Sequence, residues 1–276
     1  MIARHSLKSN PIIKSHLSLP YWLKRFKHAI KRNIIQFSPT LYWQLRYLLL
    51  SYPEPELPLI DQFCAKGLNA IDVGANYGMY TYYASKRFAK CYSFEPQPYF
   101  IKTLGKAYRN TNVELFQIAL SDHAGIETMR MPVCDRGYST IDPHNQLEGK
   151  VDESDGIETF EVKTCKLDDY SFKQVGFLKV DVEGHELEVL QGAAETIRSS
   201  KPVIYVEVEE RHREFSVQGV ESLLAGFGYN CYFLQHKKLL PFSQFLHSKS
   251  QNQETKKDYV RNFIFFHKEN LPAFVS

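Results

Sequence analysis

A run of charged side chains interrupts an apolar segment in the second half of the chain. Lys179, Asp181 and Glu183 alternate with valines, and His185 follows Gly184. Because successive side chains of a strand point to opposite faces, the three charged residues are expected to share one face. Burying charges in a central strand is costly unless they are paired or used. The run therefore predicts either a structural ion pair of Lys179 with Asp181 or Glu183, or a catalytic group.

Two residues of this run are candidates for a general base. His185 titrates near neutral pH, although a position at the start of a helix lowers a histidine pKa. Asp181 is the second candidate, because a carboxylate at the end of a central strand lies where parallel sheets bind ligands. Either side chain can take a proton from a hydroxyl group.

The segment from Asp72 to Gly78 follows an earlier apolar run and has the spacing of a ligand-binding turn. Gly74 lets the backbone turn tightly, and Gly78 allows close packing where the next helix begins. Asn76 lies between them. The free N–H groups of that helix favour a carboxylate, and Asp72 can attract an ammonium group. The spacing differs from the dinucleotide fingerprint. The alternative is a turn whose glycines serve geometry alone.

Two further strand ends carry acids. Glu95 lies 23 residues after Asp72, the distance at which an acid reaches ribose hydroxyls in a βαβ unit. It can instead be an acid at a helix start. Ser121 and Asp122 follow the next strand and are predicted to face an adenine ring, with a plain turn as the alternative.

A fifth strand ends in Glu207 and Glu209. These carboxylates can join Asp181 around a divalent cation or position a hydroxyl, and a solvated acidic strand end is the alternative. The five cysteines are scattered and include no C-x-x-C pair, which argues against a zinc site and a disulfide framework. No metal ligand is assigned.

The elements that position these residues alternate between strand and helix from about residue 60 onward, which indicates a largely parallel sheet. The expected strands are 69–74, 91–95, 113–120, 177–182, 202–208, 230–234 and 260–267, and the expected helices are 77–89, 98–109, 185–199 and 217–227. An insertion before the fourth strand contains strand-like pieces at 127–133 and 159–167. The polar loop 135–156 between them is interpreted as a lid or a substrate-binding element, with a mobile surface excursion as the alternative.

The N-terminal region differs in charge from the rest. Residues 1–50 contain nine basic and no acidic residues, and Pro20 and Pro39 each precede a helical pattern. We expect a helical extension over 1–58 and one catalytic domain over 59–276. A basic amphipathic helix can meet a membrane surface peripherally, but docking on its own domain is commoner. The N-terminus has no apolar run of the signal-peptide type, so a cytoplasmic location is expected.

Taken in order, these motifs resemble the FkbM-type family of S-adenosylmethionine-dependent methyltransferases. The resemblance rests on Asp-Val-Gly-Ala-Asn-Tyr-Gly at 72–78, Phe-Glu-Pro at 94–96, Leu-Ser-Asp at 120–122, Lys-Val-Asp-Val-Glu-Gly-His-Glu at 179–186 and Val-Glu-Val at 206–208. It implies an α/β, Rossmann-like sheet of seven strands with the last one antiparallel.

The resemblance also implies a function. S-adenosyl-L-methionine would be held by the residues matching the family's cofactor motifs, namely Asp72, Gly74, Asn76, Gly78, Glu95, Ser121, Asp122 and Asp181. The residues Lys179, Asp181, Glu183 and His185 would act on the acceptor, a hydroxyl-bearing small molecule such as a sugar or polyketide. A nucleic-acid methyltransferase of the same fold is also an alternative: its usual motifs are missing here, and the basic N-terminal region alone favours it. A protein methyltransferase and a non-catalytic binding module remain as alternatives.

Overall fold

The computed structural model describes residues 33–34, 37–50, 54–64, 67–133, 135–147, 156–245, 251 and 259–272. The helix expected after Pro20 lies outside these residues. The helix expected after Pro39 is present as α2 (Pro39–Leu50). Within the described residues, no helix combines the length and apolar character needed to cross a bilayer.

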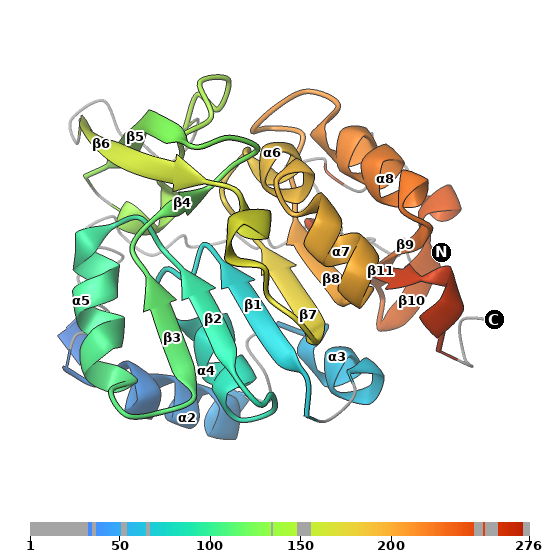
Figure 1. Cartoon of the computed structure of the whole chain (residues 1–276), viewed down its shortest axis with the longest axis horizontal. Helices are drawn as coiled ribbons and strands as arrows, with labels where there is room; N and C mark the ends of the chain where they lie inside the picture. Colours follow the sequence, from blue (N-terminus) through green and yellow to red (C-terminus); the bar gives the residue numbers. More distant parts are fainter. Residues whose placement is uncertain are drawn as a thin grey trace, which may run out of the picture.

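A mainly parallel sheet of eight strands forms the centre of the molecule (Figure 1). In spatial order it contains β10 (Lys238–Pro241), β9 (Tyr229–Gln235), β11 (Asn262–His267), β8 (Val203–Glu207), β7 (Val175–Val180), β1 (Asn69–Val73), β2 (Cys91–Phe94) and β3 (Val113–Phe116). β11 is antiparallel to both of its neighbours. The predicted seven-stranded sheet with an antiparallel last strand is therefore confirmed, and β10 extends it through a hairpin with β9.

Helices cover both faces of this sheet (Figure 1). The helices besides α2 are α3 (Leu57–Phe63), α4 (Met79–Ser85), α5 (Pro98–Ala107), α6 (Glu186–Gln191), α7 (Ala194–Ser200) and α8 (Ser216–Gly226). One apolar cluster joins α6, α7 and α8 to the sheet, and a second joins α3 and α4 to the opposite face. Neighbouring residues such as Ala70 and Ile71 belong to different clusters, as the alternation of a strand requires.

The helix expected over 185–199 is wrong as a single element. It is two short helices, α6 and α7, which are separated at Gly192 and Ala193. The chain passes very close to another segment at this point, because a Cβ atom on Gly192 would lie 2.0 Å from the carbonyl oxygen of Ser121. The end of α6 thus packs against the backbone of Ser121, where a side chain would not fit.

The insertion before β7 forms a second, three-stranded sheet. β5 (Gly125–Pro132) and β6 (Ile157–Cys165) are antiparallel, which confirms the expected hairpin. β4 (Ala119–Leu120) pairs with β6, so the predicted strand 113–120 is wrong in its second half. The chain leaves the main sheet after Phe116. The aromatic rings of Tyr170 and Phe172 pack against Phe116 of β3 and Tyr92 of β2.

Candidate functional site

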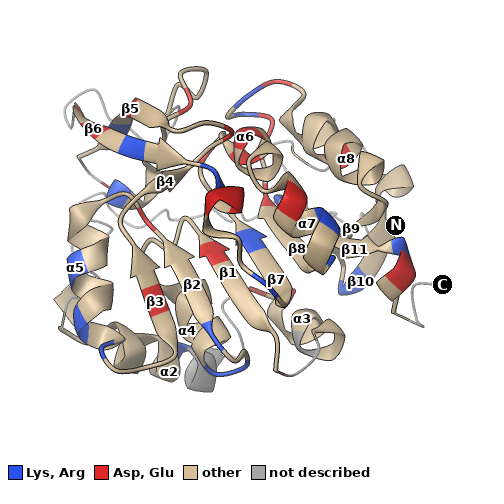
Figure 2. Cartoon of the chain, viewed as in Figure 1, with Lys and Arg blue, Asp and Glu red and all other residues tan. Residues whose placement is uncertain are grey.

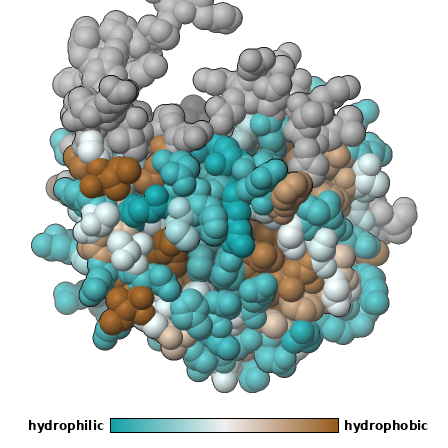
Figure 3. Space-filling view, turned by 90° about the horizontal axis from the view of Figure 1, so that it is seen from above, coloured by the Kyte–Doolittle hydropathy of each residue, from teal (hydrophilic) through white to brown (hydrophobic). Residues whose placement is uncertain are grey.

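Two adjoining cavities lie where the parallel strands end. The first has a volume of about 630 Å³ and the second about 960 Å³. They share five wall residues, Gly74, Asn76, Gly137, Asp181 and Glu183. The end of the molecule that is uppermost in Figure 1 has a mostly hydrophilic surface with separate apolar patches (Figure 3). Because the two cavities share these five wall residues, one ligand can extend from one cavity into the other.

The turn after β1 forms the wall between the cavities. Gly74 has φ +75°, and a Cβ atom there would lie 1.9 Å from the carbonyl oxygen of Asp181. Gly78 has φ +81° and lies against Leu104 of α5, where a Cβ atom would come within 2.5 Å of Cδ2. Both positions thus require glycine, one for approach to the end of β7 and one for helix packing. These are the geometric roles expected from the sequence.

Glu95 is buried at the rim of the first cavity. Its carboxylate accepts the backbone N–H groups of Asn76 and Gln97, each at 2.9 Å. Burial raises the pKa of Glu95 to about 7 in spite of these bonds. Two side-chain oxygens beside it, Oδ1 of Asn76 and Oε1 of Gln97, are buried without a partner. This edge of the cavity offers acceptors to a ligand that carries hydroxyl or amino groups.

Lys179 and Asp72 lie on neighbouring strands at the centre of the main sheet; Lys179 reaches the wall of the second cavity, whereas Asp72 lines neither cavity. Figure 2 shows their strands, β7 and β1, side by side with charged positions of opposite sign. The Lys179 ammonium lies 3.2 Å from Asp72 and 3.6 Å from Asp181, and it donates to the carbonyls of Val73 and Gly74. Burial opposes its charge, but Asp72 and Asp181 raise its pKa. The structure thus contains the expected ion pair of Lys179 with Asp181, but the shorter contact is with Asp72, which was not an expected partner.

Asp72 also accepts a hydrogen bond from Thr81 at 2.7 Å, and its side chain is buried. It is absent from the residues that line the two cavities. The expected strand 177–182 ends at Val180, so Asp181 and Glu183 follow the strand instead of lying within it. The single charged face predicted for the three residues is therefore wrong. Asp181 and Glu183 reach the cavities because the chain turns, with Glu183 at φ +57°.

Glu183 has a partner that the sequence did not reveal. His212, in the loop after β8, is buried and places Nε2 3.0 Å from the Glu183 carboxylate. Arg211 lies at 4.0 Å from the same carboxylate. The backbone carbonyl of Glu183 accepts hydrogen bonds from Thr140 and Asn145 of the insertion. A carboxylate fixed from several elements can orient a ligand group with little movement of its own.

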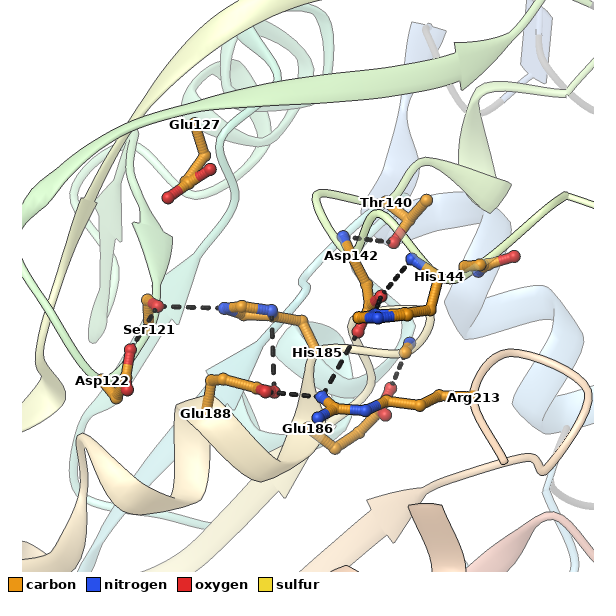
Figure 4. Close-up of polar contacts among 12 residues, drawn as sticks. Ser121, Asp122, Glu127, Thr140, Asp142, His144, His185, Glu186, Glu188 and Arg213 are labelled. Atoms are coloured by element: carbon orange, nitrogen blue, oxygen red, sulfur yellow. Dashed lines mark hydrogen bonds and ion pairs between the residues drawn. The ribbon is translucent and has the colours of Figure 1, made fainter. Parts of the chain in front are cut away.

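His185 lies against protein groups on both sides of its ring (Figure 4). Its Nε2 atom is 2.9 Å from Oγ of Ser121, and its Nδ1 atom is 3.7 Å from Glu188. Burial lowers the pKa of His185. The His185 ring borders the first cavity.

The residues expected to face an adenine ring lie elsewhere. The side chain of Asp122 pairs with exposed His123 at 2.7 Å. Ser121 and Asp122 are not among the residues that line either cavity, and Ile118, Ala119 and Leu120 line the first cavity instead.

Asp142, His185 and Glu188 are the group of described residues close enough to share a metal ion. Arg213 already lies 2.5 Å from Glu188 and 3.6 Å from Asp142 (Figure 4). Its guanidinium supplies the positive charge that this group needs.

The acids after β8 are also paired with arginines. Glu207 lies 3.6 Å from Arg261, and Glu209 lies 2.5 Å from Arg211. They are not gathered with Asp181 around one cation position. The alternative of a solvated acidic strand end is also wrong for Glu209, whose side chain is buried.

The described part of the loop, residues 135–147, forms a wall of both cavities. Gly137 accepts from the Asn76 side chain at 3.2 Å, and Gln97 donates to the carbonyl of Arg136 at 3.1 Å. Ser139 and Ile141 line the first cavity, and Tyr138 lines the second. The interpretation as a ligand-binding element fits these positions better than a surface excursion does.

The second cavity also contains residues that lie outside the sequence motifs. Tyr42, Trp43 and Arg46 of α2 border it, as do Glu54 and Arg261. The Trp43 indole donates to the carbonyl of Tyr77 at 2.8 Å, which fastens α2 to the turn after β1. No local motif marks these residues, although the spacing of Trp43 and Arg46 places both on one side of a helix.

The fold and the cavities at its strand ends are those of a methyltransferase with the S-adenosylmethionine-dependent fold. Residues 72–231, more than half of the chain, match the model of the methyltransferase FkbM domain, and the chain belongs to that family.

A curated relative, Methyltransferase sdnD of Sordaria araneosa, is 30% identical over 155 residues, which cover 45% of this chain and 60% of that protein. The chain thus spans less than two thirds of this relative. The solved methyltransferase FkbM from Methylobacillus flagellatus KT is 14% identical with a TM-score of 0.48, covering 88% of this chain and 60% of that one. A Streptococcus mutans protein solved with SAH is 12% identical with a TM-score of 0.42, covering 78% and 98%.

Proposed function

We propose that this protein transfers a methyl group from S-adenosylmethionine to a hydroxyl oxygen of a small molecule, such as a sugar or a polyketide. The observation that carries the proposal is the position of Asp181 and Glu183, whose carboxylates stand at the junction of the two cavities. One cavity then takes the adenosine part of the cofactor, and the other brings the acceptor to the same junction.

The residues of the first cavity fit an adenosine. The Glu95 carboxylate can accept from both ribose hydroxyls, because each oxygen uses one lone pair for a backbone N–H group. The unpartnered oxygens of Asn76 and Gln97 can accept from further donors. Leu120, Met129 and Ile141 supply apolar surface for a flat ring. S-adenosylmethionine, when bound, supplies a methyl group that its sulfonium has already activated.

The chain must then align a hydroxyl and take its proton. Asp181 is the better base, because it borders both cavities and its side chain keeps 28% of its surface exposed. Burial raises the pKa of Asp181, which strengthens it as a proton acceptor. His185 is poorly placed for this role, since both ring nitrogens face protein groups. Alignment by the surrounding walls is expected to contribute more than proton removal.

The second cavity favours a polyhydroxylated acceptor. Tyr42, Trp43, Tyr77 and Tyr138 contribute aromatic surface, and Glu54 and Glu183 contribute carboxylates that accept from hydroxyl groups.

The test begins with calorimetry of the full chain and S-adenosylhomocysteine. Methyl-labelled S-adenosylmethionine is then offered with sugars, polyketides, peptides, RNA and DNA, and the labelled product is identified by mass spectrometry and NMR. An O-methylated small molecule supports the proposal. Label on nucleic acid or peptide alone contradicts the acceptor class, binding without any transfer indicates a binding module, and no binding overturns the proposal.

A further inference from the structure

Arg46 stands out among the cations that border the second cavity. Lys179 is paired with Asp72 and Asp181, and Arg261 lies 3.1 Å from Glu54. Within the described part of the chain, no carboxylate pairs with Arg46, and its Nε atom is buried without a hydrogen-bond partner. An Nε–H group of a guanidinium that has lost water without gaining an acceptor is costly, although Arg46 as a whole is only half-buried. The position therefore fits a bound anion.

The helix that carries Arg46 is fixed beside the cofactor turn. Trp43, one turn earlier in α2, is 6% exposed and donates to the Tyr77 carbonyl at 2.8 Å. Tyr77 lies between Asn76 and Gly78 in the turn after β1. Arg46 thus borders the second cavity from a helix that is anchored to the wall between the cavities.

We propose that Arg46 binds the carboxylate of the methionine end of the cofactor, an inference that rests on the proposed function. With the adenosine part beside Glu95, the other end of the cofactor must pass Gly74 and Asp181 into the second cavity, because these residues border both. Its ammonium group finds carboxylates there. Its carboxylate needs a cation, and the two other cations on this wall, Lys179 and Arg261, are already neutralised. A planar guanidinium suits this group, since it can bind a carboxylate through two bonds.

The test compares two ligands by calorimetry. S-adenosylhomocysteine has the amino-acid end, and 5′-methylthioadenosine has the same nucleoside and sulfur without it. Arg46→Gln should weaken S-adenosylhomocysteine binding by about 10- to 100-fold, the usual effect of losing a charged hydrogen-bond partner, and leave 5′-methylthioadenosine within about twofold. Arg46→Lys keeps the charge, and its affinity for S-adenosylhomocysteine should lie between those of the wild type and Arg46→Gln. Gln44→Ala, on an exposed part of the same helix, is the matched control and should change neither affinity.

Unchanged S-adenosylhomocysteine affinity in Arg46→Gln would overturn the assignment, and so would an equal loss for both ligands. If the variant keeps its cofactor affinity but discriminates against acidic acceptors, the anion belongs to the acceptor and the assignment is wrong. Should Arg46→Gln fold poorly, Arg46→Lys decides by the same comparison. A wild-type chain that binds neither ligand contradicts the proposed function itself, which is a separate result.

Discussion

The two cavities are built in different ways. All the residues that border the first lie between Val73 and His185, inside the segment that matches the family model. The second also uses Tyr42, Trp43, Arg46, Glu54 and Arg261, which lie outside that segment. The first holds its key carboxylate through backbone N–H groups, whereas the second holds Lys179 and Arg261 through side-chain ion pairs. The fold itself thus provides the adenosine part of the cofactor site, and the flanking segments shape the second cavity, which would take the methionine end of the cofactor and the acceptor.

Replacing the carboxylate at the junction should break the methyl transfer for which both cavities position their ligands. Asp181→Asn removes the proposed base, and general-base catalysis contributes about 100- to 10,000-fold. We expect turnover to fall within that range while S-adenosylhomocysteine affinity changes far less. Steady-state kinetics and calorimetry measure the two effects. His185→Asn is the comparison variant, and a larger loss of turnover in that variant would return the base to His185.

Closing the turn after β1 should break the first cavity. Gly74→Ala places a Cβ atom 1.9 Å from the Asp181 carbonyl at φ +75°, so the backbone must move. Strain of this kind costs about 1–3 kcal/mol, and cofactor affinity should drop about 100-fold as the wall shifts. Thermal unfolding and calorimetry measure this. Gly226→Ala, where a Cβ atom meets nothing within 4 Å, should leave binding unchanged. Normal cofactor binding by Gly74→Ala would count against this turn as the site.

The pH dependence of S-adenosylhomocysteine affinity tests the role of Glu95 in the first cavity. Its pKa of about 7 means that it ionises as pH rises from 6 to 8, and S-adenosylhomocysteine affinity should rise with it. Glu95→Gln should weaken binding by about tenfold at pH 8 and flatten the pH dependence. Glu114→Gln, on the exposed side of β3, is the control. A pH slope that survives in Glu95→Gln would assign it to another group.

The same carboxyl affects stability with the opposite sign. Its pKa in the folded protein is raised, so the folded state binds more protons than the unfolded state does. Its contribution to the free energy of unfolding of the ligand-free protein is therefore present at low pH and lost as pH rises from about 4.5 through 7. Burial likewise raises the pKa values of Glu56 and Glu186 to about 7, and they act in the same direction. Chemical denaturation at several pH values measures the sum.

The smallest expected effect tests the contribution of Glu54 to acceptor binding in the second cavity. Glu54→Gln keeps the shape of the side chain but removes its charge beside Arg261. We expect the KM for the acceptor to change about threefold, as for one partly exposed ion pair, with S-adenosylhomocysteine affinity unchanged. Once the labelled product has identified the acceptor, steady-state competition kinetics measure the change in KM. A cofactor affinity that falls as far as in Glu95→Gln would show that Glu54 acts on the cofactor instead of the acceptor.

Sequence patterns predicted the parts of the fold that depend on local signals. The apolar runs of β1, β2 and β7 and the glycines at 74 and 78 identify the sheet and its first turn. The break between α6 and α7 falls at Gly192 and Ala193. Gly192 packs against the Ser121 backbone, a contact that the local sequence does not reveal. Ala119 and Leu120 extend an apolar run, yet their partners are Thr164 and Cys165 of β6.

The site was predictable where acids follow strands and unpredictable where segments distant in sequence meet. Glu95 and Asp181 were found because a rim position follows from strand order. His212 lies 3.0 Å from Glu183 only after β7 and β8 pair, and Arg46 borders the cavity only because Trp43 fastens α2 to Tyr77. Asp122 borders neither cavity because β3 ends at Phe116, before the expected strand end at residue 120.

The ammonium of Lys179 ties the carbonyls of Val73 and Gly74 to the carboxylates of Asp72 and Asp181. The cofactor turn and the proposed base are therefore parts of one energetically coupled unit. Substitutions at Asp72 and Asp181 should not add in free energy, since either one alone already leaves Lys179 with a single carboxylate partner. Evolution or design can vary the second cavity position by position, but these strand ends can change only together.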